Sequence, residues 1–138
     1  MGTHYKWLAI IEKALGKYSN SLEYLKKAKE NLDVALSYRP PKECKEKIIE
    51  TQNYLLALEH EIRAQIALFS YQFSQSLKEY DKASKLYEKT GDERSSRWCK
   101  TIFNILKGLE LMFDRNFSDA YKHLRRAYIE IPDELKMT

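Results

Sequence analysis

Apolar residues recur at intervals of three and four positions along most of this chain, which is the spacing of one face of an α-helix. The pattern predicts six helices, at residues 5–15, from 19 to the prolines at 40 and 41, and at 42–71, 74–89, 93–113 and 118–131. In the first helix, one predicted apolar face consists of Trp7, Ile10, Ile11, Ala14 and Leu15. No segment shows the strict alternation of a half-buried strand, so the predicted fold class is all-α.

Helix-ending and helix-starting residues stand between these segments. Gly16 follows the first helix and Gly91 follows the fourth, in the position where a left-handed C-cap residue is expected. Asp92 and Ser118 are predicted to cap the starts of the fifth and sixth helices, and Pro132 to close the sixth. Only 4 Gly and 3 Pro occur in the whole chain, which leaves few residues for the tight turns of an all-β fold.

Size and composition indicate one ordinary domain spanning residues 1–138. A chain of 138 residues with 43% hydrophobic residues can bury a stable core without disulfides or metal. Cys44 and Cys99 have no ligand spacing, so we expect two reduced thiols. Charges interrupt the apolar residues near the N-terminus, and the longest uncharged stretch, residues 64–77, is too short to span a bilayer. We therefore expect a cytoplasmic protein without membrane insertion.

The second, fourth and sixth predicted helices share an internal repeat. Each carries an aromatic, a small, a bulky and a final alanine residue at fixed offsets: Tyr18, Ser21, Leu25 and Ala28; Phe73, Ser76, Tyr80 and Ala83; Phe117, Ala120, Leu124 and Ala127. Nine residues before each aromatic stands another small residue, which is Ala9, Ala64 or Gly108. Because small side chains let two antiparallel helices approach closely, the repeat predicts three stacked helical hairpins, at about 4–38, 42–90 and 92–131.

This pattern resembles that of the tetratricopeptide repeat family. The third copy matches best, with Gly108, Phe117, Ala120, Leu124, Ala127 and Pro132. The copies are 55 and 44 residues apart rather than the roughly 34 of the family, and the second copy lacks the proline. The resemblance implies a divergent right-handed solenoid that acts as a protein–protein interaction module. A plain helix bundle is the alternative.

The resemblance also implies a binding face, lined by the first helix of each hairpin. Carried over position by position, the partner-binding residues would be Lys6, Lys13, Gln65, Ile105, Leu109 and Met112. This face changes from basic to apolar along the chain, which suits a partner peptide or helix with one acidic and one apolar end. Ile10 stands where family members that clamp a terminal carboxylate have asparagine, so that subtype is not expected. Alternatively, the apolar residues belong to the core or to a homodimer interface.

Catalytic motifs are missing from the sequence. His4, His60 and His123 have no carboxylate or cysteine at a metal-ligand spacing such as that of HExxH. No glycine-rich phosphate loop and no serine nucleophile motif occurs. The sequence therefore predicts a protein that is not an enzyme and that has no catalytic residues, no metal site and no cofactor.

Binding to nucleic acid is the alternative function. The net charge is +4, with +3, 0 and +1 in residues 1–40, 41–90 and 91–138. Two basic clusters stand out, Lys26, Lys27 and Lys29 in the second helix and Lys122, Arg125 and Arg126 in the sixth. Tyr24, Tyr38 and Tyr128 could stack on bases where they are exposed. Most such runs are solvated helix faces with i, i+4 ion pairs, so nucleic acid is the less favoured partner.

The two functions differ in their salt dependence. If the basic faces bound phosphates, replacing Arg125→Ala together with Arg126→Ala would reduce the steepness of log affinity against log salt for single-stranded DNA by about 1.4. We expect fluorescence anisotropy with single-stranded DNA to show no such change, because the protein-binding function does not use these residues. A steep slope that the double substitution reduces would favour the nucleic-acid function instead.

Overall fold

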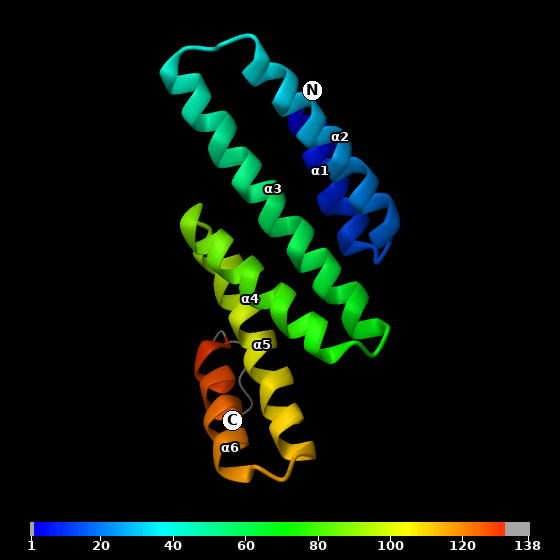
Figure 1. Cartoon of the computed structure of the whole chain (residues 1–138), viewed down its shortest axis with the longest axis vertical. Coiled ribbons are helices and arrows are strands. Elements are labelled where there is room, and N and C mark those ends of the chain that lie inside the picture. Colours follow the sequence, from blue (N-terminus) through cyan, green and yellow to red (C-terminus); the bar gives the residue numbers. More distant parts are fainter. Residues whose placement is uncertain (1, 132–138) are drawn as a thin grey trace.

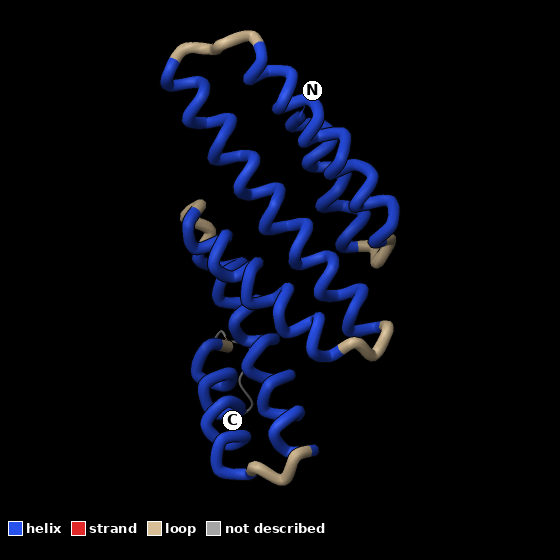
Figure 2. The backbone as a smooth tube through the Cα atoms, viewed as in Figure 1, coloured by secondary structure: helices blue, strands red, loops and turns tan. Residues whose placement is uncertain are grey.

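All six predicted helices are present in the computed structural model, which describes residues 2–131 (Figure 1). They are α1 (Gly2–Ala14), α2 (Tyr18–Ser37), α3 (Lys42–Phe69), α4 (Phe73–Lys89), α5 (Glu93–Phe113) and α6 (Phe117–Glu130). Short loops connect them, and no strand occurs among these described residues (Figure 2). The predicted all-α fold class is confirmed.

The helix caps follow the prediction in one case and not in another. The Asp92 carboxylate accepts a hydrogen bond from the Ser95 amide at 3.1 Å, so the predicted N-cap of α5 is confirmed. Ser118 is not a cap, because α6 begins one residue earlier, at Phe117, and Asn116 accepts the bond from the Asp119 amide. Pro132, predicted to close α6, lies outside the described residues.

Helices that follow one another in the sequence pack side by side in space. The long α3 has the α1–α2 pair on one side and α4 on the other, and α5 and α6 extend the stack toward the opposite end (Figure 1). This packing of adjacent helices is consistent with a helix bundle. A tetratricopeptide-like solenoid remains a prediction.

Four of the five connections are the same three-residue turn. The middle residue of each has a positive φ: Gly16 at 77°, Tyr71 at 60°, Gly91 at 83° and Arg115 at 60°. In each turn the next amide donates to the carbonyl five positions earlier, at 2.8–2.9 Å. These bonds satisfy the free carbonyls at the end of the preceding helix. Only the α2–α3 connection, which contains Pro40 and Pro41, differs.

The paired small residues of the repeat do bring neighbouring helices close together. The Ser21 hydroxyl donates to the Ala9 carbonyl at 2.6 Å, and the Ser76 hydroxyl to the Ala64 carbonyl at 2.9 Å, in each case across twelve residues. A hydroxyl reaches a backbone carbonyl of the neighbouring helix only where the two backbones are close. The same bond joins Ser96 to Ser84 between α4 and α5, so this contact is not confined to the predicted hairpins.

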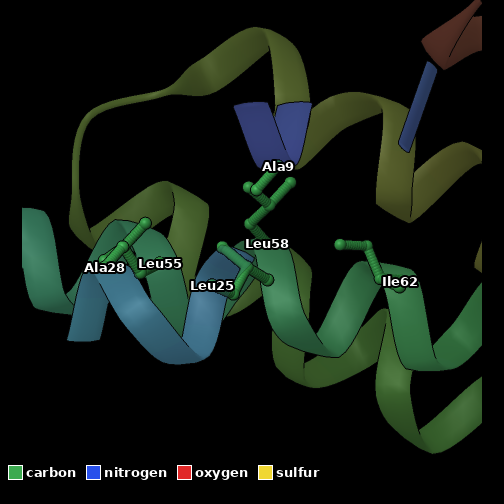
Figure 3. Packing of buried hydrophobic residues seen from close by; sticks show 6 residues of the cluster. All are labelled: Ala9, Leu25, Ala28, Leu55, Leu58 and Ile62. Atoms are coloured by element: carbon green, nitrogen blue, oxygen red, sulfur yellow. The ribbon is translucent and has the colours of Figure 1, made fainter. Parts of the chain in front are cut away.

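The core consists of two clusters that meet on α3. One joins α1, α2 and α3 through Ala9, Leu25, Ala28, Leu55, Leu58 and Ile62 (Figure 3). The other joins α3, α4 and α5 through Ala57, Ala64, Tyr80, Ala83, Tyr87 and Cys99. Because opposite sides of α3 contribute to the two clusters, this helix couples the two ends of the molecule.

The predicted apolar face of α1 is wrong in part, because Ile10 does pack against the first core cluster but three other members do not. Ala9 at 0% exposure makes the core contact, whereas Trp7, Ile11 and Leu15 are more than half exposed. The reason is that α1 lies at the end of the stack, where only one side is covered. Periodicity locates the stripe of large apolar residues on a helix. A close contact between two helices instead uses the stripe of small residues.

The four equal turns allow a matched stability test. A Cβ on Gly91 meets no atom within 4 Å, so Gly91→Ala is expected to destabilise only through its left-handed backbone, by about 1 kcal/mol. Arg115→Gly, at the corresponding position, is expected to stabilise by about 0.5 kcal/mol, measured by urea unfolding. Arg125→Gly, inside α6, is the control and is expected to destabilise. Destabilisation by Arg115→Gly would contradict the argument.

Candidate functional site

A groove of about 870 Å³ runs between α1, α3 and α5. Its walls come from the end of α1, the C-terminal part of α3 and the first half of α5, and Tyr18 at the start of α2 also lines it. These three helices are the first helices of the predicted hairpins, the ones from which the sequence predicted a binding face. A groove of this size can hold several side chains of a peptide.

The structure places two of the six predicted partner-binding residues in the groove. Lys13 and Gln65 line it. Lys6 does not, and its ammonium lies 4.5 Å from the centre of the Tyr54 ring instead. Ile105, Leu109 and Met112 do not line it either. They lie farther along α5, where Leu109 and Met112 are each 43% exposed.

The groove floor contains a buried ion pair. Glu61 on α3 is only 3% exposed, and its Oε2 lies 2.8 Å from the Lys13 ammonium of α1. Its other oxygen accepts a hydrogen bond of 2.7 Å from the Tyr87 hydroxyl of α4. A carboxylate is buried at acceptable cost only with such a counter-charge and hydrogen bonds. The Glu61 side chain therefore joins three helices and fixes the position of Lys13.

Two titratable side chains close to Glu61, those of Tyr87 and Cys99, have shifted pKa values. Burial, followed by the charge of Glu61, raises the pKa of the Tyr87 hydroxyl and of the Cys99 thiol above their ordinary values. Cys99 is fully buried, so its thiol is protonated and inaccessible, which is the opposite of a reactive cysteine. Both groups thus stabilise the core in their neutral forms.

Gln65 has an unsatisfied hydrogen-bond acceptor. Its Oε1 atom is buried and has no hydrogen-bond partner within the described part of the chain. A buried polar atom without a partner costs about 1–3 kcal/mol, so such an atom in a groove calls for a physical explanation. A ligand that carries an N–H donor would supply the missing bond.

The α5 wall of the groove combines positive charge with an aromatic surface. Arg94, Arg97 and Trp98 line it, the two arginines outnumber the one acidic residue there, Glu93, and the Trp98 side chain is 47% exposed. Sequence reasoning missed these three residues because it transferred positions from the family pattern. Their spacing was a usable signal, because Arg94, Arg97 and Thr101 follow one another at intervals of three and four along one side of α5, with Trp98 next to Arg97.

Among the described residues, the other polar side chains do not gather into a metal-binding cluster. His60 bonds to Glu79, and the Nδ1 atom of His123 lies 3.0 Å from the Asn104 side-chain oxygen. Within residues 2–131, no three His, Cys, Asp or Glu side chains lie close enough together to hold a metal ion. None of the helices in that range combines the length and apolar character needed to cross a lipid bilayer.

The two basic clusters lie on separate helices, α2 and α6, at opposite ends of the molecule (Figure 1). Several of their members have local partners: Lys29 pairs with Glu59, and Lys122 lies 3.8 Å from Asp119. Tyr24 is partly buried and stacks on Tyr5. The clusters therefore do not form one continuous strip along which a nucleic-acid backbone could run.

Comparisons with protein-family models, curated proteins and solved structures found no match. The resemblance to the tetratricopeptide repeat family therefore rests on the repeated residues of this chain alone.

The buried Tyr87 predicts a pH dependence of stability. Since its pKa is raised in the folded state, its contribution is complete below the ordinary tyrosine pKa of about 10 and is lost as the pH rises above it. Tyr87→Phe is therefore expected to reduce the fall in unfolding free energy above this pH by about 1.4 kcal/mol per pH unit. Urea unfolding between pH 9 and 11 measures this slope.

Tyr38→Phe is the matched control for this experiment, because Tyr38 is 80% exposed and should leave the slope unchanged. At neutral pH, Tyr87→Phe should also destabilise the protein by about 1–2 kcal/mol, because Glu61 loses a hydrogen bond. Equal slopes for Tyr87→Phe and the unmodified protein would contradict the prediction.

Proposed function

We propose that this protein is an interaction module that binds a segment of a partner protein in the groove between α1, α3 and α5. Binding is non-covalent and involves no chemical reaction. The observation that carries the proposal is the pairing of an unsatisfied acceptor, Gln65 Oε1, with a half-exposed indole, Trp98, in one groove. A peptide supplies both complements, an N–H donor and an apolar side chain.

The chemistry of α5 suggests the direction of the bound segment. Arg94 and Arg97 lie near the start of this helix, and Ile105, Leu109 and Met112 follow toward its end. A segment lying along α5 would therefore place acidic residues near the arginines and apolar residues beyond Trp98. The change from basic to apolar that the sequence predicted across three hairpins occurs here along one helix.

We also propose that the stack is a divergent tetratricopeptide-like solenoid. The support is the repeated contact of small residues, Ala9 with Ser21 and Ala64 with Ser76. In the third pair, Gly108 leaves so little space that a Cβ would lie 2.7 Å from the Leu124 side chain. In such a solenoid the groove would lie on the face lined by the first helix of each pair.

The test is selection of peptides from a display library on the full chain, followed by affinity measurement with two matched variants. Trp98→Ala is expected to weaken binding of the selected peptides at least tenfold, because a central aromatic anchor contributes about 2 kcal/mol. Trp7→Ala is the control, since Trp7 is similarly exposed but lies on α1 outside the groove. Leu109→Glu should weaken the binding of only those peptides whose apolar part extends beyond Trp98.

Circular dichroism of each variant establishes that it is folded before affinities are compared. If Trp7→Ala lowers the affinity of the selected peptides and Trp98→Ala does not, the binding surface lies on the outer side of α1 instead of in the groove. Failure to select any peptide that competes for the groove would contradict the proposed function.

A further inference from the structure

We propose that two copies of this chain associate through one exposed side of α6, with the two α6 helices antiparallel across a two-fold axis. None of the described residues of α6 lines the groove, so this surface is separate from the one proposed to bind a partner. The equivalence of α6 with α2 and α4, the exposure of its aromatic residues and the order of its side chains support the inference.

The three pairs of consecutive helices are equivalent in a second contact, beyond that of the small residues. Residues 19 positions apart contact each other in every pair of helices, namely Tyr5 with Tyr24, His60 with Glu79, and Asn104 with His123. In each case the first residue lies four positions before the small residue of its helix. Positions along α2, α4 and α6 therefore correspond one for one.

In α2 and α4, the helix that follows in the sequence covers one side. The Tyr18 ring of α2 stacks on Phe69 of α3, with ring centres 6.0 Å apart, and Lys29 pairs with a glutamate of α3. The α4 residue equivalent to Lys29 is Ser84, whose carbonyl accepts a hydrogen bond from the Ser96 hydroxyl of α5. The covering helix is antiparallel to the covered one, because a short loop joins them.

The same side of α6 is uncovered. Among the described residues, α6 packs extensively only against α5, at the end of the stack (Figure 1). Phe117, the equivalent of Tyr18, is 63% exposed. Tyr121 is 64% exposed, whereas its equivalent in α4, Leu77, is 7% exposed. Phe113, which ends α5, is exposed as well. Large aromatic side chains exposed together in this way are typical of an interaction surface.

The side chains on this side of α6 complement those of a second copy. Phe117, Tyr121 and Arg125 follow one another at intervals of four, so they form one ridge on the helix surface. A two-fold axis at Tyr121 places the same ridge opposite in reversed order. Each Arg125 guanidinium then lies over the Phe117 ring of the other copy, and the two Tyr121 rings meet at the axis.

The energetics of these contacts favour this arrangement. A guanidinium is attracted to the face of an aromatic ring, and two offset tyrosine rings stack favourably. Arg125 is exposed and forms no ion pair with another described residue, so it is available for this contact. Ridges of residues four apart interdigitate at about −50°, which is the commonest crossing of two helices. A second copy thus supplies the antiparallel helix that α3 and α5 supply elsewhere in the stack.

The first experiment is sedimentation velocity of the full chain over a range of concentrations, in which a dimer is expected. Tyr121→Glu should weaken the dimer at least about tenfold, because it places two carboxylates at the axis. The matched control is Tyr38→Glu, the same substitution at an exposed position outside α6. A chain that remains monomeric, or a dimer that Tyr121→Glu leaves intact, would overturn the proposal.

A side-chain exchange tests the antiparallel order independently of general effects on folding. Arg125→Glu alone should weaken the dimer, because a carboxylate then faces the Phe117 ring. Combining Arg125→Glu with Phe117→Arg should restore it, because opposite charges then face each other across the axis. Failure of this double variant to dimerise, although circular dichroism shows it to be folded, would overturn the proposed register.

Cross-linking locates the axis itself. In a chain with Cys44→Ser, which removes the exposed thiol, Tyr121→Cys should form a disulfide-linked dimer on mild oxidation. Phe117→Cys should not, because it faces Arg125 and not its own copy. Cross-linking through Phe117→Cys instead would overturn the antiparallel arrangement. A monomeric chain that binds selected helical peptides, with an affinity that Tyr121→Glu lowers, would overturn self-association and assign this side of α6 to a partner helix.

Discussion

Close approach of consecutive helix backbones is the constraint on which the rest of this structure depends. Ser21 and Ser76 can reach a carbonyl of the preceding helix only because the residues between the backbones are alanine or serine. Equal three-residue turns then hold each pair in the same register. With the helices this close, the larger side chains are directed into the two core clusters or out to the groove and the exposed faces.

Glu61 links this packing to the groove. A buried carboxylate needs partners, and it finds them on the helices before and after its own, Lys13 on α1 and Tyr87 on α4. The ion pair makes a rigid polar floor, while the α5 wall with Trp98 remains accessible. Lys13, predicted from the sequence as a contact for a partner, thus has a structural role first.

Part of the candidate site could be predicted from the sequence, and part could not. The face made by the first helix of each pair includes Lys13 and Gln65, and both line the groove. Ile105, Leu109 and Met112 lie beyond the groove, because a family pattern fixes which helical side faces inward but not how far along it a neighbouring helix extends. Arg94 and Trp98 line the groove because α1 ends opposite the start of α5, and this depends on helix lengths and crossing angles.

The six helices, their approximate ends and the small residues at which they touch could be predicted from the sequence, because these depend on local periodicity, capping and side-chain size. The buried stripe of α1 and the position of the groove, in contrast, depend on how the helices pack against one another. Apolar spacing is equally compatible with a buried face and with a face at the end of a stack. The difference between them arises from which neighbours are present, and that is a property of the assembled helices.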